Sequence, residues 1–200
     1  MSDLEKFLHD EPERTPVLVK AAIAHAQFET IHPFLDGNGR VGRLLITLLL
    51  CSEGVLTQPL LYLSLYLKRH RDAYYEHLQN IRLRGAWEAW LEFFLEGVIS
   101  VSISATDTTR NILQLIERDR RTIHELGRAA ATAHRVHELA SRRVVLNAGG
   151  TARRLGISEP TVYNALSRLE EAGILREATG RRRGRLYVYD GYLALLQADD

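Results

Sequence analysis

The chain has 200 residues, a formal net charge of +1 and a hydrophobic share of 46%, which excludes a disordered chain and allows one domain or two small ones. Its single cysteine, Cys51, excludes a disulfide framework within the chain and is typical of a reducing cytoplasm. The first residues lack a signal-peptide pattern, and the longest apolar run, Leu44 to Cys51, is too short to span a bilayer. We therefore expect a soluble, cytoplasmic protein with no membrane partner.

The charge is unevenly distributed along the sequence. Residues 142–189 contain ten arginines and four glutamates, whereas residues 1–141 contain 16 basic and 18 acidic side chains. This asymmetry predicts a basic C-terminal module with an anionic partner, although a solvated basic face is the alternative.

Helical spacing of apolar residues dominates the first 141 residues. Thr15 can cap the first helix, with Pro16 at its first position, and Pro33 ends it because the residue before a proline is disfavoured in the α region. Gly54 is the stop signal of the second helix. Together the signals predict helices over 16–31, 39 or 40 to 52, 64–83, 87–116 and 123–141.

The pattern changes after Leu146. A loop over 147–150 precedes a short helix over 151–155 and a longer helix that Ser158 caps and Gly173 ends. Two short strands, over 175–176 and 186–189, flank a basic turn. Two helices around a tight turn, followed by a hairpin, predict a winged helix-turn-helix.

The most informative segment is His32-Pro33-Phe34-Leu35-Asp36-Gly37-Asn38-Gly39-Arg40-Val41-Gly42-Arg43. Two glycines flank Asn38, so the backbone can turn sharply and approach a ligand closely. The helix that follows presents unpaired N–H groups at its start, and Arg40 and Arg43 share one of its faces. Two guanidinium groups beside a helix N-terminus suit a polyphosphate.

Two further residues complete a reactive site within these twelve positions. Asp36 offers a hard oxygen ligand suited to Mg²⁺ beside the phosphate site. His32 directly precedes the loop and can accept a proton from an attacking hydroxyl group.

Other interpretations of these residues are weaker. Residues 37–42 match the pattern G-x-G-x-x-G, but a helix and not a strand precedes them, which argues against a dinucleotide-binding fold. His25 fits the apolar face of its helix and is expected in the core. His134 and His137 lack partner cysteines and are expected to form a surface pair and not a metal site. The aromatic stripe of Trp87, Trp90, Phe93 and Phe94 is expected in the core.

Residues 32–43 resemble the signature of the Fic family, HPFx[DE]GNGRxxR, with every fixed position present. The flanking segments 24–31, 59–64 and 74–75 are also similar to the family, and the resemblance covers roughly residues 3–118. It implies a helical core that transfers AMP from ATP to a Ser, Thr or Tyr hydroxyl of a protein.

The resemblance also implies roles for individual residues. His32 is the general base, Asp36 holds Mg²⁺ on the α- and β-phosphates, and Phe34 anchors the loop in the core. The phosphate-binding residues are Gly37, Asn38, Gly39, Arg40 and Arg43. Tyr74 and Tyr75 line an adenine pocket or, as an equal alternative, pack in the core.

Two features usual in the family are not visible in the sequence. One is a β-hairpin flap before the motif helix, which holds the target segment. The other is an inhibitory helix with the pattern [ST]-x-x-x-E-[GN]. Glu53 and Glu96 match its last letters, but Leu49 and Glu92 occupy the Ser/Thr position. We therefore expect a site without internal inhibition.

The winged segment has two interpretations, which the sequence leaves open: duplex DNA binding, or protein interaction including a homodimer. The DNA interpretation places side chains of the second helix at base edges and the basic turn on phosphates. Its candidate residues are Thr161, Tyr163, Asn164, Arg168, Arg181, Arg182, Arg183 and Arg185.

These observations predict a mainly α protein with a Fic-type core over 1–118, a connecting helix over 119–144 and a winged helix-turn-helix over 145–200. The first functional hypothesis is a protein adenylyltransferase with ATP, Mg²⁺ and a protein hydroxyl as reactants. The second is a DNA-binding regulator that senses nucleotide through a core with little or no turnover. The sequence names neither the target protein nor the donor nucleotide, because the motif recognises phosphates and not a base.

Overall fold

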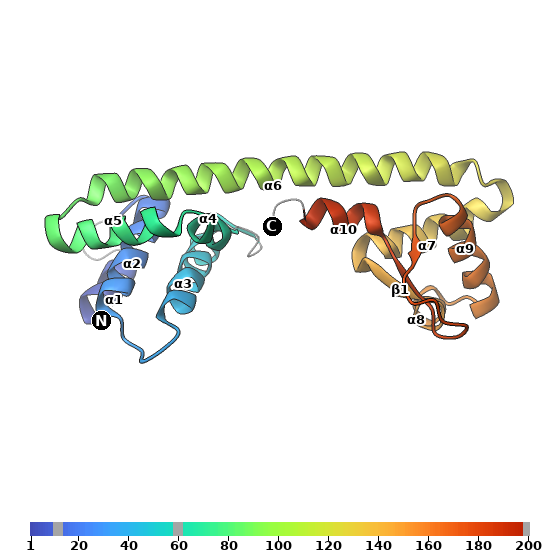
Figure 1. Ribbon diagram of the computed structural model, residues 1–200, viewed down its shortest axis with the longest axis horizontal. Coiled ribbons are helices and arrows are strands. Elements are labelled where there is room, and N and C mark those ends of the chain that lie inside the picture. Colours follow the sequence, from blue (N-terminus) through green and yellow to red (C-terminus); the bar gives the residue numbers. More distant parts are fainter. Residues whose placement is uncertain (10–13, 58–61, 198–200) are drawn as a thin grey trace. The chain divides into compact units, whose positions relative to one another are not determined.

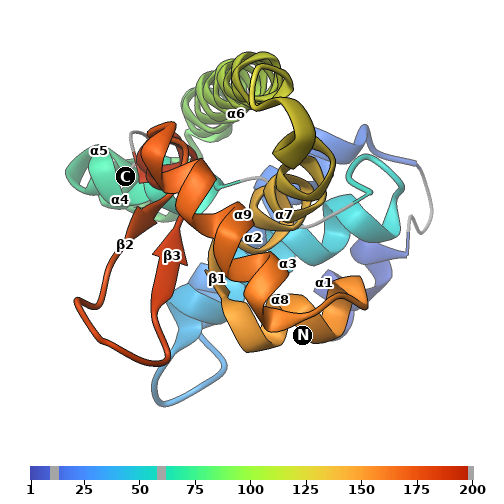
Figure 2. The same ribbon diagram turned by 90° about the vertical axis from the view of Figure 1, so that its right-hand side faces the viewer.

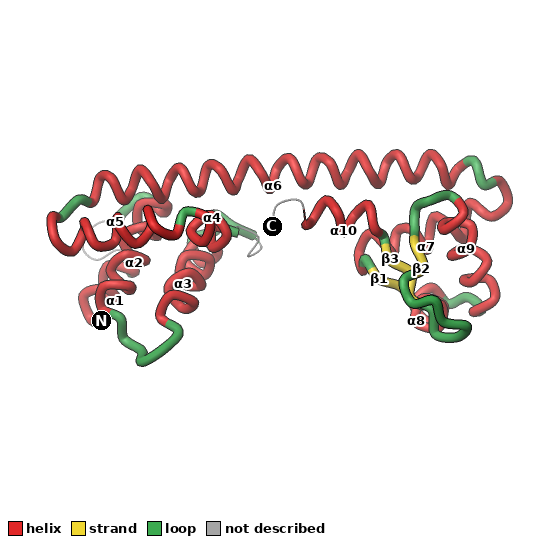
Figure 3. Tube along the Cα trace, in the orientation of Figure 1, coloured by secondary structure: helices red, strands yellow, loops and turns green. Residues whose placement is uncertain are grey.

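The protein, described here by a computed structural model over residues 1–9, 14–57 and 62–197, forms two compact units, Met1–Ala105 and Thr106–Asp200. Both units are mainly helical, as the expected fold class requires (Figures 1 and 3). Helix α6 contributes residues to both units. The helices of the first unit are α1 Ser2–Leu8, α2 Val17–Ile31, α3 Asn38–Ser52, α4 Leu63–Arg69, α5 Arg71–Arg84 and the first part of α6 Trp87–His124.

Helices α2 and α3 are neighbours in the first unit and carry the candidate site between them (Figure 1). Helix α2 begins at Val17, directly after Pro16, and ends at Ile31, one residue before His32 and two before Pro33. Small buried residues on α2 allow the two helices to approach closely. These residues are Ala21, Ala22, Ala24 and Ala26.

The core of the first unit is built around the aromatic stripe of α6. Trp90 and Phe94 are fully buried and Phe93 is nearly so, which confirms the sequence-based expectation for these rings. The indole N–H of Trp90 donates a hydrogen bond to the carbonyl oxygen of Ala22 at 3.0 Å. This bond satisfies a buried polar group and fixes α6 against α2.

Helix α6 is also long and apolar enough, by length and composition alone, to cross a membrane. Its most apolar window of 18 residues has a mean hydropathy of 1.3, and 22% of that window is buried. The helix contains no long uninterrupted apolar run, because Ser100, Ser102 and Ser104 alternate with apolar residues. The absence of a membrane partner stays a prediction.

The second unit combines helices with a small antiparallel sheet. The strand order is β1-β3-β2, and Tyr187 of β3 pairs with Leu146 of β1 and Glu177 of β2. Figure 2 shows the connection between β2 and β3 extending beyond the strands. After the end of α6, the elements are a 3₁₀ turn Gly127–Ala129, α7 Ala130–Arg143, β1 Val145–Asn147, α8 Ala148–Leu155, α9 Glu159–Glu171, β2 Arg176–Glu177, β3 Leu186–Val188 and α10 Asp190–Gln197.

A buried polar network joins three segments of the second unit. The hydroxyl group of Tyr189, which follows β3, donates a hydrogen bond to Asp119 Oδ2 on α6 at 2.6 Å and lies 3.0 Å from His137 Nε2 on α7. All three side chains are almost completely buried. Burial lowers the pKa of His137, although the nearby Asp119 carboxylate opposes this effect. The network therefore fixes α6, α7 and the end of the sheet to one another.

The position of His137 corrects one expectation from the sequence. His134 and His137 do not form a surface pair, because His137 is 1% exposed and bonded to Tyr189. In the sequence, a buried histidine cannot be told from an exposed one by its spacing. The difference becomes visible only when its hydrogen-bond partner in the folded protein, here Tyr189, is known.

Several predicted boundaries were wrong. The single helix expected over 64–83 is divided at His70 into α4 and α5, and α6 continues to His124 instead of ending near residue 116. The helix expected over 123–141 is α7, which begins at Ala130. Strand β1 and helix α10 were not expected. The family-like segment beginning at Pro59 lies, up to residue 61, outside the described residues.

The buried network makes a stability prediction. Replacing Tyr189 with Phe removes the hydroxyl donor and leaves Asp119 Oδ2 buried without it, so we expect the free energy of unfolding to fall by about 1–3 kcal/mol. Denaturant titration of the full chain measures this change. The control is Tyr192→Phe, a half-buried tyrosine on the same core, which should change the free energy by less than about 0.5 kcal/mol. Equal losses in the two variants would show that the Tyr189–Asp119 bond has no special role.

Candidate functional site

The loop between α2 and α3, residues 32–37, carries His32, Asp36 and Gly37 of the predicted site (Figure 3). The other motif residues of the site, Asn38, Gly39, Arg40 and Arg43, lie on the first turns of α3. His32 adopts a left-handed backbone conformation with φ 49°, and its N–H donates to the carbonyl oxygen of Phe28 at 2.9 Å. Gly37, at the other end, is also left-handed with φ 83°. A non-glycine residue in this region is uncommon, so the surrounding contacts must hold His32 in place. They hold it with its side chain exposed, directly after the end of α2 and six residues before α3 begins at Asn38.

Asn38 holds the loop closed from within. Its side chain is 2% exposed and makes two hydrogen bonds with the backbone of Phe34: Oδ1 accepts from the N–H at 2.9 Å, and Nδ2 donates to the carbonyl oxygen at 2.6 Å. The amide side chain therefore acts as a clamp within the loop. Any contribution of Asn38 to phosphate binding must come from its backbone, because its side chain is committed to the loop.

The two motif arginines lie over the two glycines at the start of α3. A β-carbon added to Gly37 would lie 3.4 Å from Arg40 Nη2, and one added to Gly39 would lie 3.2 Å from Arg43 Nη1. Each guanidinium thus occupies the space that a side chain at the glycine would take. The first turn of α3 is lined by two cationic forks and by N–H groups that have no partner within the helix. This arrangement is suited to a polyphosphate.

Asp36 is exposed beside the same turn. Its Oδ1 accepts the Gly37 N–H at 2.7 Å, and its Oδ2 lies 3.6 Å from Arg40 Nη2, with the Asp36 side chain 95% exposed. One accessible carboxylate next to a phosphate site fits Mg²⁺, which commonly takes one or two carboxylates and completes its shell with water and phosphate oxygens. Among the described residues, no group of three or more His, Cys, Asp or Glu side chains is placed to hold a metal ion. A metal at Asp36 would therefore need the phosphates as co-ligands.

Phe34 does not occupy the position expected for it. It was predicted to anchor the loop in the core, but its side chain is 51% exposed and contacts Phe28 only at a ring-centroid distance of 6.3 Å. The expectation was wrong because Asn38, through hydrogen bonds, supplies the anchor that a buried ring would otherwise provide.

Behind the loop, His25 belongs to the core, as expected. Its Nε2 lies 2.9 Å from the hydroxyl oxygen of Tyr74, and its ring stacks on Trp90. Burial lowers the pKa of His25 to about 4, so the ring is neutral at physiological pH. Tyr74 is 4% exposed, so core packing and not an adenine contact is its role, whereas Tyr75 is 54% exposed and carries Arg71 over its ring at 5.6 Å.

Gly42 explains the glycine spacing that resembles a dinucleotide motif. A β-carbon at Gly42 would lie 2.6 Å from Glu29 Oε1 and 3.2 Å from the ring of His25. The third glycine therefore permits helix–helix contact between α2 and α3. The segment follows a helix, and the described residues of the first unit contain no strand, so the argument against a dinucleotide-binding fold holds.

Comparisons with known proteins agree with this geometry. Residues 1–50 match the Fic/DOC family. The Fic motif, residues 32–43, lies within the matched region. The fold is similar to the crystal structure of a Fic family protein from Desulfovibrio desulfuricans G20, with a TM-score of 0.50 and 24% identity over 94% of this chain and 53% of that one.

Several curated relatives are named protein adenylyltransferases. A probable one from Aquifex aeolicus is 44% identical over 57 residues, which are 28% of this chain and 18% of the relative. One from Culex quinquefasciatus is 46% identical over 80 residues, which are 40% of this chain and 15% of the relative. One from Drosophila sechellia is 30% identical over 124 residues, which are 60% of this chain and 24% of the relative. The matched part is thus less than a quarter of each relative's length.

Neither glutamate considered for an inhibitory role in the Fic site is placed at Arg43. Glu53 Oε1 bonds Lys20 Nζ at 2.7 Å at the C-terminal end of α3, ten residues beyond Arg43. Glu96 lies beside Tyr66, whose pKa is raised mainly by burial and also by this carboxylate.

Sequence reasoning missed a third glutamate, Glu29, which is buried directly beneath the motif turn. A signal for it exists, because Glu29 lies four residues after His25 and therefore on the same buried face of α2.

The candidate DNA-binding residues of the second unit are mostly exposed. Thr161, Asn164 and Arg168 are exposed on α9, but Tyr163 is half-buried and packs against the core. A base contact by the Tyr163 ring is therefore not available without repacking. The four basic residues of the β2–β3 connection, Arg181, Arg182, Arg183 and Arg185, are all exposed.

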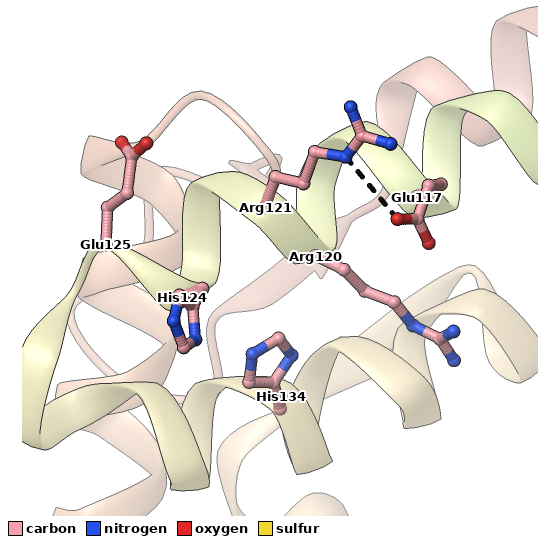
Figure 4. Close-up of a pocket in the computed structure, with 6 residues that line it drawn as sticks. All are labelled: Glu117, Arg120, Arg121, His124, Glu125 and His134. Carbon is pink, nitrogen blue, oxygen red and sulfur yellow. Dashed lines mark hydrogen bonds and ion pairs between the residues drawn. The ribbon is translucent and has the colours of Figure 1, made fainter.

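The pocket drawn in Figure 4 lies within the second unit and contains none of the motif residues. It encloses about 410 Å³ between the end of α6 and α7. Its walls carry mixed charge, and Arg121 is paired with Glu117 at 3.4 Å. The pocket lining is Glu117, Arg120, Arg121, His124, Glu125 and His134. The motif residues 32–43 thus lie outside this pocket.

The clamp in the loop makes a prediction that requires no substrate. Replacing Asn38 with Ala removes both hydrogen bonds to the backbone of Phe34. We therefore expect the Phe34 amide hydrogen to exchange with solvent about tenfold faster or more, because each loss of about 1.4 kcal/mol in the free energy of local opening raises the exchange rate tenfold. Hydrogen exchange of the Phe34 amide measures this. The amide of His32, which is held by Phe28, serves as an internal reference. Unchanged exchange at Phe34 would mean that the loop is held by other contacts.

Proposed function

We propose that the first unit transfers AMP from ATP to a Ser, Thr or Tyr hydroxyl of a protein. The observation that carries this proposal is the placement of Arg40 and Arg43 over Gly37 and Gly39, at the end of the loop that begins with His32. A cationic turn that can hold phosphates is thereby joined to a base that can activate a hydroxyl group. The names of the relatives support the same reaction.

In this reaction, His32 accepts the proton of the attacking hydroxyl group. The hydroxyl oxygen forms a bond to the α-phosphorus, the bond from that phosphorus to the bridging oxygen breaks, and pyrophosphate leaves. Arg40, Arg43 and the first N–H groups of α3 stabilise the negative charge on the transferring and leaving groups. Each of these groups is positioned before substrate arrives, which reduces the reorganisation required in the transition state.

We further propose that Asp36 holds Mg²⁺ together with the nucleotide. The metal ion would neutralise phosphate charge. Asp36 contributes an exposed carboxylate that the Gly37 N–H orients. Tyr75 remains the candidate ring for the adenine base, since it is exposed, but the motif itself does not specify the base of the donor.

The role of His32 is tested by replacing it with Ala. We expect transfer of label from α-labelled ATP to protein to fall about 10²–10⁴-fold, because the proton acceptor is lost. Binding of Mg·ATP, measured by calorimetry, should be retained, because the arginines and the helix start are unchanged. Comparable turnover in the variant would remove His32 from the mechanism. Transfer of label from γ-labelled ATP would instead indicate a kinase-like reaction.

A second candidate function concerns the second unit. We propose that α8, α9 and the β2–β3 hairpin form a winged helix-turn-helix that binds duplex DNA. The specific observation in favour is the exposed arginine cluster at residues 181–183 and 185, in the connection between two short strands. With a first unit that binds nucleotide without turnover, the chain would act as a nucleotide-sensing regulator. In that case α-labelled ATP would mark no protein.

The DNA proposal predicts a difference in salt dependence. Replacing Arg181, Arg182 and Arg183 with Ala in the full chain should reduce the slope of log affinity against log salt by about 3, because each lost phosphate contact releases about one counterion fewer. The control changes the same charge elsewhere in the unit, with Arg120, Arg121 and Arg128 replaced by Ala. Equal affinities and slopes for the two triple variants, or no DNA binding at low salt, would favour the protein-interaction interpretation.

A further inference from the structure

Glu29 is a buried carboxylate that the mechanism above does not use. Its residue is 7% exposed, and its Oε1 has no hydrogen-bond partner among the residues that the structure describes. A buried carboxylate oxygen without a hydrogen-bond partner normally destabilises a fold, and a glutamine of the same shape would avoid the cost of burying the charge. The presence of a charged group at this position therefore points to a role other than packing.

The Glu29 carboxylate lies on the buried side of the first turn of α3. Glu29 Oε1 would be 3.8 Å from a β-carbon on Gly39, and Arg43 Nη1 would be 3.2 Å from the same atom. The carboxylate and the guanidinium thus flank one glycine. The absent side chain at Gly42, where a β-carbon would lie 2.6 Å from Glu29 Oε1, leaves room for the carboxylate to reach α3.

The charges around Glu29 are those of the site itself. Burial raises the pKa of Glu29, and interactions with His32, Arg43 and Arg82 oppose that effect without cancelling it. Arg82 of α5 also bonds the Glu29 carbonyl oxygen at 2.8 Å, which fixes the backbone that carries the carboxylate. Glu29 therefore lies near two guanidinium groups, of which that of Arg43 belongs to the motif.

We propose that Glu29 is a positioning residue, whose buried carboxylate holds the Arg43 guanidinium over Gly39 so that it is correctly placed before a phosphate binds. This inference rests on the proposed function for its catalytic consequence, but the positioning of Arg43 is a property of the free protein. Arg43 is half-buried on the first turns of α3 and has a long, flexible side chain that would otherwise sample several rotamers. A fixed negative charge on one side of Gly39 restricts that freedom.

The direct test is the mobility of Arg43 in the full chain without nucleotide. The Nε–H signal of Arg43, assigned by its loss in Arg43→Lys, should have a high heteronuclear NOE in the unaltered protein and a markedly lower one in Glu29→Gln. Glu29→Asp keeps the charge and should retain more order than Glu29→Gln. Glu53→Gln is the matched control, because it also neutralises a glutamate that contacts α2, but at the far end of α3. Equal Arg43 order in the unaltered protein and Glu29→Gln, or equal loss in Glu53→Gln, would overturn the inference.

A stability measurement separates positioning from a structural role. The pKa of Glu29 is higher in the folded protein than its ordinary value of about 4.5. Ionisation of the Glu29 carboxyl group therefore lowers the free energy of unfolding as the pH rises through the folded-state pKa. This loss is absent at pH values below the ordinary pKa. Glu29→Gln should therefore be at least as stable as the unaltered protein at pH 7, with the difference disappearing in acid. Glu53→Gln should be less stable, since it breaks the bond to Lys20. A Glu29→Gln variant that is clearly destabilised at pH 7 would make Glu29 a structural residue and contradict the proposal.

The catalytic readout is the split between kcat and KM. If the protein transfers AMP, Glu29→Gln should lower kcat by about 10²-fold through misplacement of Arg43, while KM for ATP changes far less because positive charge remains at the turn. Glu53→Gln should leave both constants unchanged. If the unaltered protein transfers nothing, the proposed function fails, and the Arg43 signal alone still decides whether Glu29 positions it.

Discussion

The close contact of α2 with α3 is the constraint on which the candidate site depends. At Gly42, α3 has no side chain, and His25 and Glu29 of α2 occupy the space that a β-carbon would need. The end of α2, the six-residue loop and the first turn of α3 are consequently held against each other. His32 at one end of the loop and Arg40 and Arg43 beyond the other end are therefore placed by the same helix pair.

The buried layer beneath the loop explains how a surface site can be rigid. Asn38 bonds both backbone groups of Phe34, and His25 is held between Tyr74 and Trp90. Buried polar groups with satisfied hydrogen bonds restrict alternative packings more than apolar contacts do. The reacting groups remain exposed, but the backbone that carries them does not move freely. Positioning of this kind reduces the entropy that a reaction between two substrates must otherwise lose.

Much of the first unit could be predicted from the sequence, because its signals are local. Pro33 ends α2, the glycines of residues 37–39 permit the turn, and helical spacing assigns Trp90 and Phe94 to the core. The position of Phe34 was expected from the family resemblance and not from a local signal, and that expectation was wrong. Glu29 was missed because its significance depends on Gly39 and Gly42, ten and thirteen residues further along the chain.

In the second unit, the parts that could not be predicted depend on contacts between distant residues. Strand β1 exists because it pairs with β3, some forty residues later, and three residues alone carry no strand signal. His137 is buried because Asp119 and Tyr189 provide its polar surroundings. Where the elements follow one another directly, as with α8, α9 and the β2–β3 hairpin, the sequence was sufficient to predict their order.

The central claim is that the start of α3 is a phosphate site built by the α2–α3 pair. The most direct measurement is the change in backbone amide chemical shifts when Mg·ATP, and separately adenosine, is added to the full chain. We expect Mg·ATP to shift the amides of residues 37–43 most strongly, and adenosine to leave them nearly unchanged, because the site contacts phosphates. Shifts of equal size with adenosine, or shifts confined to other parts of the chain, would contradict this interpretation of the structure.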